Sequence, residues 1–479
     1  MGAALATGCA VGPDYDRPDP ALPGGWAGTG APTTRGSATS ARAADVARWW
    51  TSFNDATLDS LVERAVGANF TLKQAGARVR QARASRGVTA AGYYPTLDAS
   101  GDYRRTGSGG GSSDSSGTGT ADTTRDNDAR DLFQVGLDAA WEIDVFGGVR
   151  RGVEAADANV RAAEADRHDA LVTLVSEVAL NYLDLRGFQR QLAIAHGNLE
   201  VQRRSADLVR RRARGGLQSG LDVANADAQV ASTASQIPGL ESGARQAIYN
   251  LSVLLGRDPA ALLPELTPDK PIPTTPPEVP VGLPSDLLRR RPDVRRAEAQ
   301  LHAATARIGV ATADLFPRFS LTGSFGLDGE DVKSLTNWSS RTWSVGPSVR
   351  WPIFDAGRIR ANIQVQTAAQ EEALYGYEQT VLVALRDVES ALIAYAKEQQ
   401  HRAALVEVVT HNRTAVDLAQ RLYGQGQTDF LSVIDAQRSL YGAEDALVRS
   451  DRTIATNLVA LYKALGGGWE AAPATRPAQ

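Results

Sequence analysis

Four segments of the chain alternate apolar and polar residues with a period of two, the pattern of strands with one apolar face and one polar face. In one of them every second residue from Phe133 to Ile143 is apolar, whereas Gln134, Asp138 and Glu142 fall on the other side. Such strands occur both in soluble sandwiches and in membrane barrels. The alternation predicts strands at about residues 95–105, 132–144, 317–328 and 342–354.

Other segments have apolar residues that recur every seven positions, the spacing of packed coiled-coil helices. The segment from Val149 to Arg214 contains no proline and would extend about 100 Å as a single helix. We therefore expect long paired helices rather than the shorter helices of an ordinary bundle. The two ladders of apolar residues are Leu171, Val178, Leu185, Leu192 and Leu199, and Val433, Leu440, Leu447, Ile454 and Leu461.

The sequence repeats itself in two halves, which are joined by a proline-rich connector at residues 259–284. Trp141 and Trp351 occupy matching positions 210 residues apart, and Gly216 matches Gly426 at the same offset. A repeat of this length is a duplicated domain and not a short-period solenoid. The predicted organisation is a first repeat at 46–258, the connector, a second repeat at 285–468 and a C-terminal tail at 469–479.

The four predicted strands of one chain are too few to close into a barrel. Aromatic residues near the ends of the apolar faces, together with the long flanking helices, favour a membrane barrel over a soluble sandwich. Open strand edges are not tolerated in lipid, so the sheet would have to close between chains. Two chains would give eight strands and a nearly filled interior, whereas three would give twelve and leave a lumen for the polar faces. The pattern therefore predicts a trimer if the protein is a channel.

Composition narrows the classes of function. The 479 residues are 43% hydrophobic and 22% charged, which excludes wholesale disorder, and the net charge of −4 disfavours nucleic-acid binding. No apolar run approaches the roughly 18 residues of a membrane-spanning helix. One cysteine and five scattered histidines give neither a disulfide nor a metal-binding pattern, so we expect no metal and no cofactor.

The small residues before Cys9 resemble the lipobox of bacterial lipoprotein precursors, in which the cysteine becomes the acylated N-terminus. We expect residues 1–8 to be a residual signal peptide and residues 9–45, rich in small residues and proline, to be a lipidated tether. Ala10 stands where an inner-membrane retention signal would place Asp, so the resemblance to these lipoproteins implies sorting to the outer membrane. The alternative is a lone buried cysteine.

Three motifs carry a family resemblance. They are Leu287-Leu-Arg-Arg-Arg-Pro-Asp-Val294, Phe316-Pro-Arg-Phe-Ser-Leu-Thr-Gly323 and Leu431-Ser-Val-Ile-Asp-Ala-Gln-Arg438. Together they are similar to the signature of the TolC-like outer membrane factors, in particular the NodT-type lipoprotein branch with its OprM-like and CusC-like members. The resemblance covers nearly the whole chain, from Cys9 to about residue 465.

The resemblance implies a mainly α-helical trimer with a membrane β-barrel part of twelve strands, four from each chain, continued by a long coiled-coil α-barrel in the periplasm. It implies a lipid-anchored outer-membrane exit duct of a tripartite RND efflux system, passively conducting drugs or other toxic small molecules. The partners would be a periplasmic adaptor and an inner-membrane RND-type transporter. An outer-membrane component of a metal-ion efflux or type I secretion system is the alternative.

A hydrolase and a coiled-coil spacer of the cell envelope are the rival functions. Paired carboxylates could form a hydrolytic site, but the acidic residues lie mainly on polar helix faces, where solvation explains them. A spacer would need neither strands with polar faces nor a lipobox. We therefore expect a conduit and not an enzyme.

In the family, the resting duct is closed at its periplasmic end, where paired helices taper. The matching turns are residues 214–220 and 423–428. The resemblance implies that these two tips contact the adaptor. The residues concerned are Gly215, Gly216, Leu217 and Gln218 in the first tip, and Gly424, Gly426, Gln427 and Thr428 in the second.

The resemblance also implies a gate beside the tips, formed by Asp222, Tyr423, Leu431, Asp435 and Arg438. In the OprM-like branch the residue matching Arg438 ties to the acid matching Asp222 on the neighbouring hairpin. The residue matching Leu431 forms an apolar ring beside the acid matching Asp435. The residue matching Tyr423 hydrogen-bonds across the closed gate.

The gate assignment has a plainer alternative. Asp222 could cap a helix, Asp435 could be solvated, and Arg438 could form an exposed ion pair worth under about 1 kcal/mol. Thr428 and Ser432 stand where TolC itself carries an arginine and a second aspartate. The TolC version of the lock is therefore only partly present.

Overall fold

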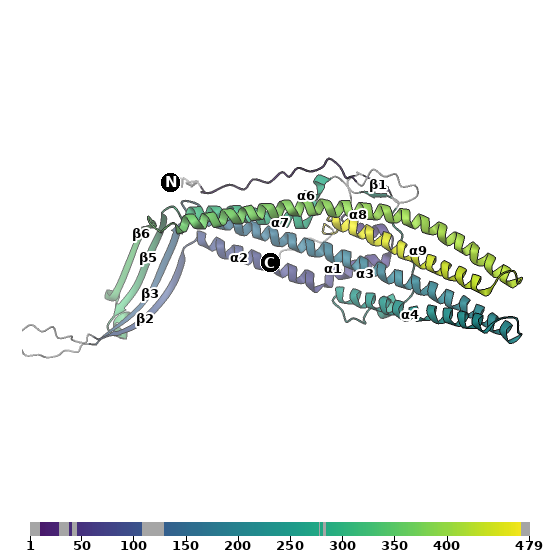
Figure 1. The fold of residues 1–479 in the computed structure, drawn as a ribbon. Helices are drawn as coiled ribbons and strands as arrows, with labels where there is room; N and C mark the ends of the chain where they lie inside the picture. Colours follow the sequence, from purple (N-terminus) through teal and green to yellow (C-terminus); the bar gives the residue numbers. More distant parts are fainter. Residues whose placement is uncertain are drawn as a thin grey trace, which may run out of the picture. The chain divides into compact units, whose positions relative to one another are not determined.

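A computed structural model describes residues 10–27, 38–40, 46–107, 129–276, 278–280 and 284–470 of the chain (Figure 1). Cys9, the predicted acylation site, lies outside the described residues. The chain divides into two compact units. The first unit contains the residues up to Arg17, Gln81–Val160 and Ala299–Leu374, and the second contains Pro18–Arg80, Arg161–Glu298 and the residues from Tyr375 onward.

The first unit contains an antiparallel sheet of four strands. In order across the sheet they are β2 (Thr96–Thr106), β3 (Arg130–Ile143), β5 (Arg318–Gly329) and β6 (Arg341–Arg350), side by side in Figure 1. The register places Asp98, Asp138 and Ser324 in one row of the same face. On this face the hydroxyls of Ser320 and Ser348 lie 2.7 Å apart. The expected polar face is therefore continuous across the sheet.

The last strand ends earlier than its sequence pattern predicts. The alternation continues to about residue 354, but β6 ends at Arg350. Pro352 has no N–H to donate to a neighbouring strand. The indole of Trp351 donates instead to the carbonyl of Leu315 at 3.0 Å. The alternation of apolar and polar residues therefore continues beyond the last residue of the paired strand.

The two halves of the chain form matching pairs of long helices. α3 (Gly148–Arg214) and α8 (Arg358–Gly424) have 67 residues each, and α4 (Gly220–Leu254) and α9 (Phe430–Ala464) have 35 each. Corresponding helices begin 210 residues apart. The duplication seen in the sequence therefore extends to the helix boundaries, although α4 contains Pro238, which has no proline counterpart in α9.

The remaining elements are shorter. The α-helices are α1 (Ala56–Ala68), α2 (Phe70–Ala90), α5 (Leu263–Leu266), α6 (Leu287–Arg290) and α7 (Pro292–Ala313). Two three-residue strands, β1 (Ala38–Ser40) and β4 (Glu278–Pro280), pair in parallel. Single 3-10 turns lie at Trp49–Phe53, Ala91–Tyr93, Pro284–Asp286, Val332–Thr336 and Trp338–Ser340. In the part of the chain that the structure describes, no helix combines the length and apolar character needed to cross a membrane.

The largest apolar core lies in the second unit, between the long helices and the turn at Trp49–Phe53. Trp49 is 2% exposed, and its ring stacks on Tyr462 of α9 with the centroids 5.3 Å apart. Both predicted seven-residue ladders contribute to buried surfaces. Their buried members are Leu171, Val178, Leu185 and Leu199 on α3, and Val433, Ile454 and Leu461 on α9.

The residues that follow Cys9 are extended, as expected of a tether, but they are packed on the first unit. The N–H of Val11 donates to the carbonyl of Phe146 at 3.1 Å, and Arg151 of α3 donates to the carbonyl of Val11 at 3.2 Å. A Cβ added to Gly12 would lie 2.4 Å from the Cα of Gly309 on α7. At the start of the predicted tether, the backbone of Gly12 therefore lies so close to Gly309 that a side chain at residue 12 would not fit.

Candidate functional site at the hairpin tips

Each long hairpin turns at a glycine in the left-handed conformation. Gly216, between α3 and α4, and Gly426, between α8 and α9, both have a φ of +74°. No atom lies within 4 Å of a Cβ built on either glycine, so the backbone conformation and not the space requires glycine. The N–H groups of Leu217 and Gln427 donate to the carbonyls five residues earlier, each at 2.9 Å. The two tips are therefore copies of one turn.

The helices that leave the tips are capped by different residues. The Ser219 hydroxyl accepts from the N–H of Asp222 at 3.2 Å and donates to the Asp222 carboxylate at 2.7 Å. At the second tip the carboxylate of Asp429 accepts from the N–H of Ser432 at 3.0 Å. Hydrogen bonds from the Ser432 hydroxyl and then its N–H lower the pKa of Asp429. Asp222 thus performs, within this chain, the capping role named above as the alternative to gating.

Tyr423 connects the two hairpins at their tips. It is 5% exposed, and its hydroxyl accepts from the side-chain amide of Gln218 at 2.7 Å. The guanidinium of Arg212 lies 4.6 Å from the ring centroid and donates to the Tyr423 carbonyl at 3.4 Å. The ring also packs on Phe430, with the centroids 5.3 Å apart. A side chain from α8 is therefore held by α3, by the first tip and by α9.

A small apolar cluster lies beside Tyr423 and links α3, α4, α8 and α9. Val209 of α3 is fully buried in it. Packing therefore reinforces the polar contacts of Tyr423. The buried members of the cluster are Ala206, Val209, Ala226, Tyr423, Phe430, Val433 and Ile434.

Arg438 does not pair with Asp222 within the chain. Its Nε and Nη2 donate to the side-chain oxygen of Gln229 on α4 at 3.3 and 3.1 Å. The reason is the distance of each residue from the tips. α4 begins at Gly220 and α9 at Phe430, so Asp222 lies in the first helical turn while Arg438 and Gln229 lie about two turns farther on. Within one protomer, the expected pair is replaced by an arginine–amide contact.

The remaining candidate residues surround the tips and are mostly exposed. Leu217 is 76% exposed and Leu431 50% exposed, and Asp435 is exposed as well. The Thr428 hydroxyl donates to that of Ser432 at 3.1 Å. Gly215, Gly216, Gly424, Gly426 and Gln427 are exposed, and Gln218 and Thr428 are half-buried. The tips therefore combine a buried link within the chain with exposed groups available to other chains.

The sequence pattern does not single out Arg212 or Gln229 as site residues. Arg212 lies in an arginine-rich run whose ordinary interpretation is a solvated helix face. Its counterpart at the 210-residue offset is Leu422, and an arginine that replaces an apolar residue in a duplicated helix indicates partial burial. No comparable signal marks Gln229, because its role depends on contact between helices far apart in the sequence.

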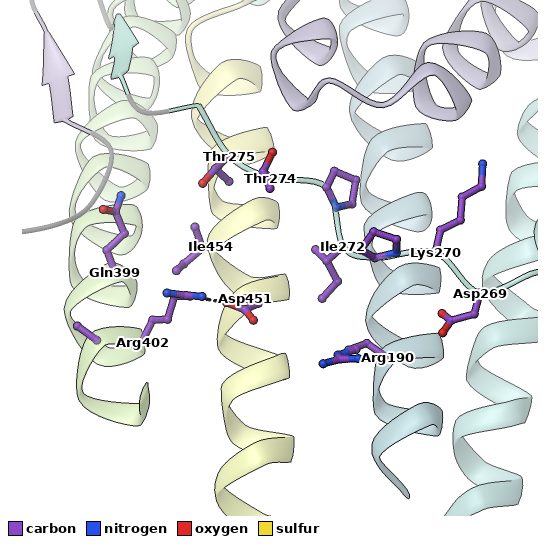
Figure 2. A pocket seen from close by; sticks show the side chains of 13 residues that line it. Arg190, Asp269, Lys270, Ile272, Thr274, Thr275, Gln399, Arg402, Asp451 and Ile454 are labelled. Atoms are coloured by element: carbon purple, nitrogen blue, oxygen red, sulfur yellow. Dashed lines mark hydrogen bonds and ion pairs between the residues drawn. The ribbon is translucent and has the colours of Figure 1, made fainter. Parts of the chain in front are cut away.

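A separate cavity of about 760 Å³ lies under the proline-rich connector in the second unit, between α3, α8 and α9 (Figure 2). Arg402 and Asp451 form an ion pair on its wall (Figure 2). Lys270 donates to the Thr57 hydroxyl at 2.8 Å. Arg402 lies about 33 Å from the end of α8, so this cavity is not part of the tips. Across the residues described, no three His, Cys, Asp or Glu side chains converge as a metal site requires.

Comparison with known protein families gives a match over both halves of the chain. The model of the family described as outer membrane efflux protein matches residues 61–257 and 283–467. The unmatched residues between these two ranges fall within or directly beside the proline-rich connector.

Characterised relatives match along most of their length. The pyoverdine export outer membrane protein OpmQ of Pseudomonas aeruginosa is 37% identical over 89% of each chain. The nodulation protein T of Rhizobium leguminosarum bv. trifolii is 31% identical, and the cation efflux system protein CusC of Escherichia coli 32% identical, each over 97% of this chain and 96% of the relative.

Solved structures share the fold. The outer-membrane channel OprN superposes with a TM-score of 0.87 at 37% identity, over 96% of this chain and all of that one (100%). A structure of CusC superposes with a TM-score of 0.81 at 29% identity and the same coverage, 96% and 100%.

Proposed function

The chain belongs to the outer membrane efflux protein family and is an outer-membrane efflux duct, and we propose that its hairpin tips form the periplasmic gate and the adaptor-contact surface. The observation that carries the proposal is the buried contact of Tyr423 with Gln218 and Arg212. This contact binds the two hairpins of a chain to each other at the tips. Separating the hairpins to open a passage would require it to break.

The fold is that of the trimeric TolC-like channels. In a trimer, β2 of one chain and β6 of the next would pair, because these are the two edges of the described sheet. Twelve strands would then form one closed sheet with the polar face inside. Large apolar side chains on the other face support this arrangement, since Leu97 and Trp343 are each 69% exposed in the single chain.

The same threefold arrangement gives the exposed tip residues a role. Leu431 and Asp435 of three chains would gather near the narrow end of the duct, an apolar ring beside a ring of carboxylates. Like charges at close range repel, so the closed state needs compensating contacts. Within each chain Tyr423 holds the two hairpins together at the tips, and Arg438 places a cation one helical turn beyond Asp435. Asp222 contributes by fixing the start of α4.

The proposed action is passive conduction without catalysis. The duct would receive its cargo from an RND-type transporter through a periplasmic adaptor, and the domains at 46–258 and 285–468 would supply one hairpin each. The names of the relatives point to different cargo, pyoverdine for OpmQ and cations for CusC, at similar identity to this chain. Since these names do not agree on one cargo, the cargo proposed for this chain is the broader class of small molecules, such as drugs or other toxic compounds.

Gly216→Val is expected to leave the trimer folded and to reduce adaptor docking. A Cβ at this position has no atom within 4 Å, so the main cost is the left-handed conformation, about 1–2 kcal/mol, which the turn would relieve by changing shape. Photocrosslinking in cells, with the crosslinker at Leu217 or Gln427, measures docking. These positions are preferred to Gln218, whose side chain is bound to Tyr423.

Gly197→Val is the matched control for Gly216→Val. Gly197 is an exposed residue of α3 that also has no atom within 4 Å of an added Cβ, but its φ is not positive. The control should crosslink to the adaptor as the wild type does. If a functioning pump gives no adaptor crosslink from either tip, the docking assignment is wrong.

Cys9 is expected to carry the lipid anchor. Val11 and Gly12, two and three residues after Cys9, are packed on α3 and α7. Mass spectrometry of the mature N-terminus from native membranes should find a triacylated cysteine, and an unmodified thiol there would refute the assignment. Cys9→Ser should still form trimers, because strand pairing supplies a second anchor.

A further inference from the structure

The internal duplication allows the two tips to be compared position by position. The helices on both sides of them begin and end 210 residues apart, and Gly216 and Gly426 share a φ of +74°. On this matched backbone the side chains differ most at the end of α3. Arginines there whose counterparts on α8 are uncharged are Arg204 (Thr414), Arg210 (Gln420), Arg212 (Leu422) and Arg214 (Gly424).

Several of these arginines have partners inside the chain. Arg204 pairs with Glu200 at 3.0 Å. Arg210 pairs with Asp207 at 2.6 Å and, across the hairpin, with Asp227 at 2.5 Å. Arg212 is engaged with the tyrosine of the gate, as described above. These charges therefore stabilise the tip itself and are not available to a partner.

Arg211 and Arg214, in the last turn of α3, are different. Both are exposed, and neither has a carboxylate partner among the described residues. The counterpart of Arg211 is Arg421, which pairs with Asp417 at 2.7 Å. The equivalent acid at the first tip, Asp207, is already held by another arginine. Two cations are thus uncompensated at the first tip, while the matching cation at the second is neutralised.

The position of Arg214 at a helix C-terminus does not account for it. A cation there interacts favourably with the helix dipole. However, α8 ends in the same geometry with Gly424 in place of Arg214, so the turn forms without that charge. The first tip also exposes Leu217 and Leu221, at 76% and 69%, whereas their counterparts are Gln427 and Leu431, of which only Leu431, at 50%, is an exposed leucine. The first tip alone therefore combines two free cations with an exposed pair of leucines.

We propose that the adaptor docks on the first tip through carboxylates, with Arg211 and Arg214 pairing with Asp or Glu side chains at the end of an adaptor helical hairpin. This rests on the proposed function, in which the tips contact an adaptor. In the trimer, three cationic tips would alternate with three tips that lack this pair. Charge complementarity would then decide which adaptor hairpin meets which tip.

The test measures binding of the purified trimer to the adaptor that crosslinks from Leu217 or Gln427, at about 50 mM and about 300 mM salt. The double variant Arg211→Glu/Arg214→Glu should bind about tenfold more weakly at low salt, mainly through slower association, and added salt should strengthen its binding instead of weakening it. Arg211→Lys/Arg214→Lys keeps the charge and should stay within about threefold of the wild type. The matched control Arg421→Glu, at the equivalent position of the second tip, should stay within about twofold.

The outcomes separate this inference from the proposed function. Recovery of binding when an acidic residue at the adaptor tip is changed to arginine would support the pairing directly. Unchanged affinity of the Glu double variant at both salt concentrations would overturn the inference and leave the docking site in place. An altered ion selectivity of the duct with unchanged adaptor binding would place the arginines in the bore and also overturn it. Absence of any adaptor crosslink would refute the proposed function and this inference together.

Discussion

Replacing Arg291 with methionine is expected to lower the free energy of unfolding of the second unit by about 3–5 kcal/mol. Arg291 is 8% exposed, and its Nε and Nη2 donate to the two carboxylate oxygens of Asp293 at 3.0 and 2.6 Å. It also pairs with Asp387 of α8 at 3.3 Å and donates to the carbonyl of Ala464 in α9 at 3.1 Å. The variant would leave Asp293 without its paired guanidinium, while Asp387 keeps its contact with Arg386 at 2.8 Å, and it would disconnect the start of α7 from both helices.

The cost of Arg291→Met should depend on pH. Burial alone raises the pKa of Asp293, but the hydrogen bonds and charge of Arg291 outweigh burial and lower it. A carboxyl group whose pKa falls on folding stabilises the fold above its unfolded pKa of about 3.9, and this contribution is lost as the pH falls through the folded pKa. In the variant, Arg291 no longer opposes the effect of burial, which raises the pKa of Asp293. The destabilisation should therefore be largest near neutral pH and should shrink on acidification.

Thermal unfolding in detergent, followed by circular dichroism at about pH 7 and about pH 4, measures this effect. Arg289→Met is the matched control, because Arg289 belongs to the same arginine run but is exposed, and its replacement should change stability by less than about 0.5 kcal/mol. If the two variants melt together at neutral pH, Arg291 is not a buried link between α7, α8 and α9.

Tyr423→Ala should shift the gate strongly toward its open state. The substitution removes a hydrogen bond worth about 1 kcal/mol and a cation–π contact worth about 0.5–2 kcal/mol, both formed only while the hairpins are together. A loss of about 2 kcal/mol in each chain becomes about 6 kcal/mol if the three chains open in concert, a shift of about 10⁴-fold in the closed-to-open ratio. The closed state would then no longer dominate.

Cells that carry Tyr423→Ala should become more sensitive to antibiotics that are too large to cross the outer membrane. Tyr423→Phe keeps the ring and loses the bond from Gln218, so an intermediate sensitivity is expected. Tyr375→Ala removes a tyrosine of α8 that is 65% exposed and should behave as the wild type. Equal sensitivity of all three variants and the wild type, at equal amounts of trimer, would contradict the role of Tyr423.

The sequence predicts the architecture well because the relevant signals are local or repeated. The family resemblance is confirmed by the match to the family and by the fold of the solved channels. The offset between Gly216 and Gly426 predicts that the turns of both hairpins match, and both have the same φ of +74°. A positive φ depends on the glycine itself and on the helix cap beside it. The residues of the turn are therefore enough to predict its backbone conformation.

The contacts of the gate are less accessible to sequence reasoning. Pairing of Arg438 with Gln229 instead of Asp222 follows from the distance of each residue from its own tip, which becomes visible only when α4 and α9 are placed side by side. The close backbone contact between Gly12 and Gly309 joins residues almost 300 positions apart in the chain. No periodicity along the chain encodes such a contact. The family resemblance identifies Tyr423, and the structure shows its partners.

Single-channel conductance of the purified trimer in a planar bilayer measures whether the duct is closed at the hairpin tips. The wild type is expected to open rarely and briefly, Tyr423→Ala to conduct for most of the record, and Arg438→Ala to show raised conductance as well. Tyr375→Ala should match the wild type. Wild-type conductance in both gate variants would contradict closure at these residues, and the absence of current from every variant would contradict the duct itself.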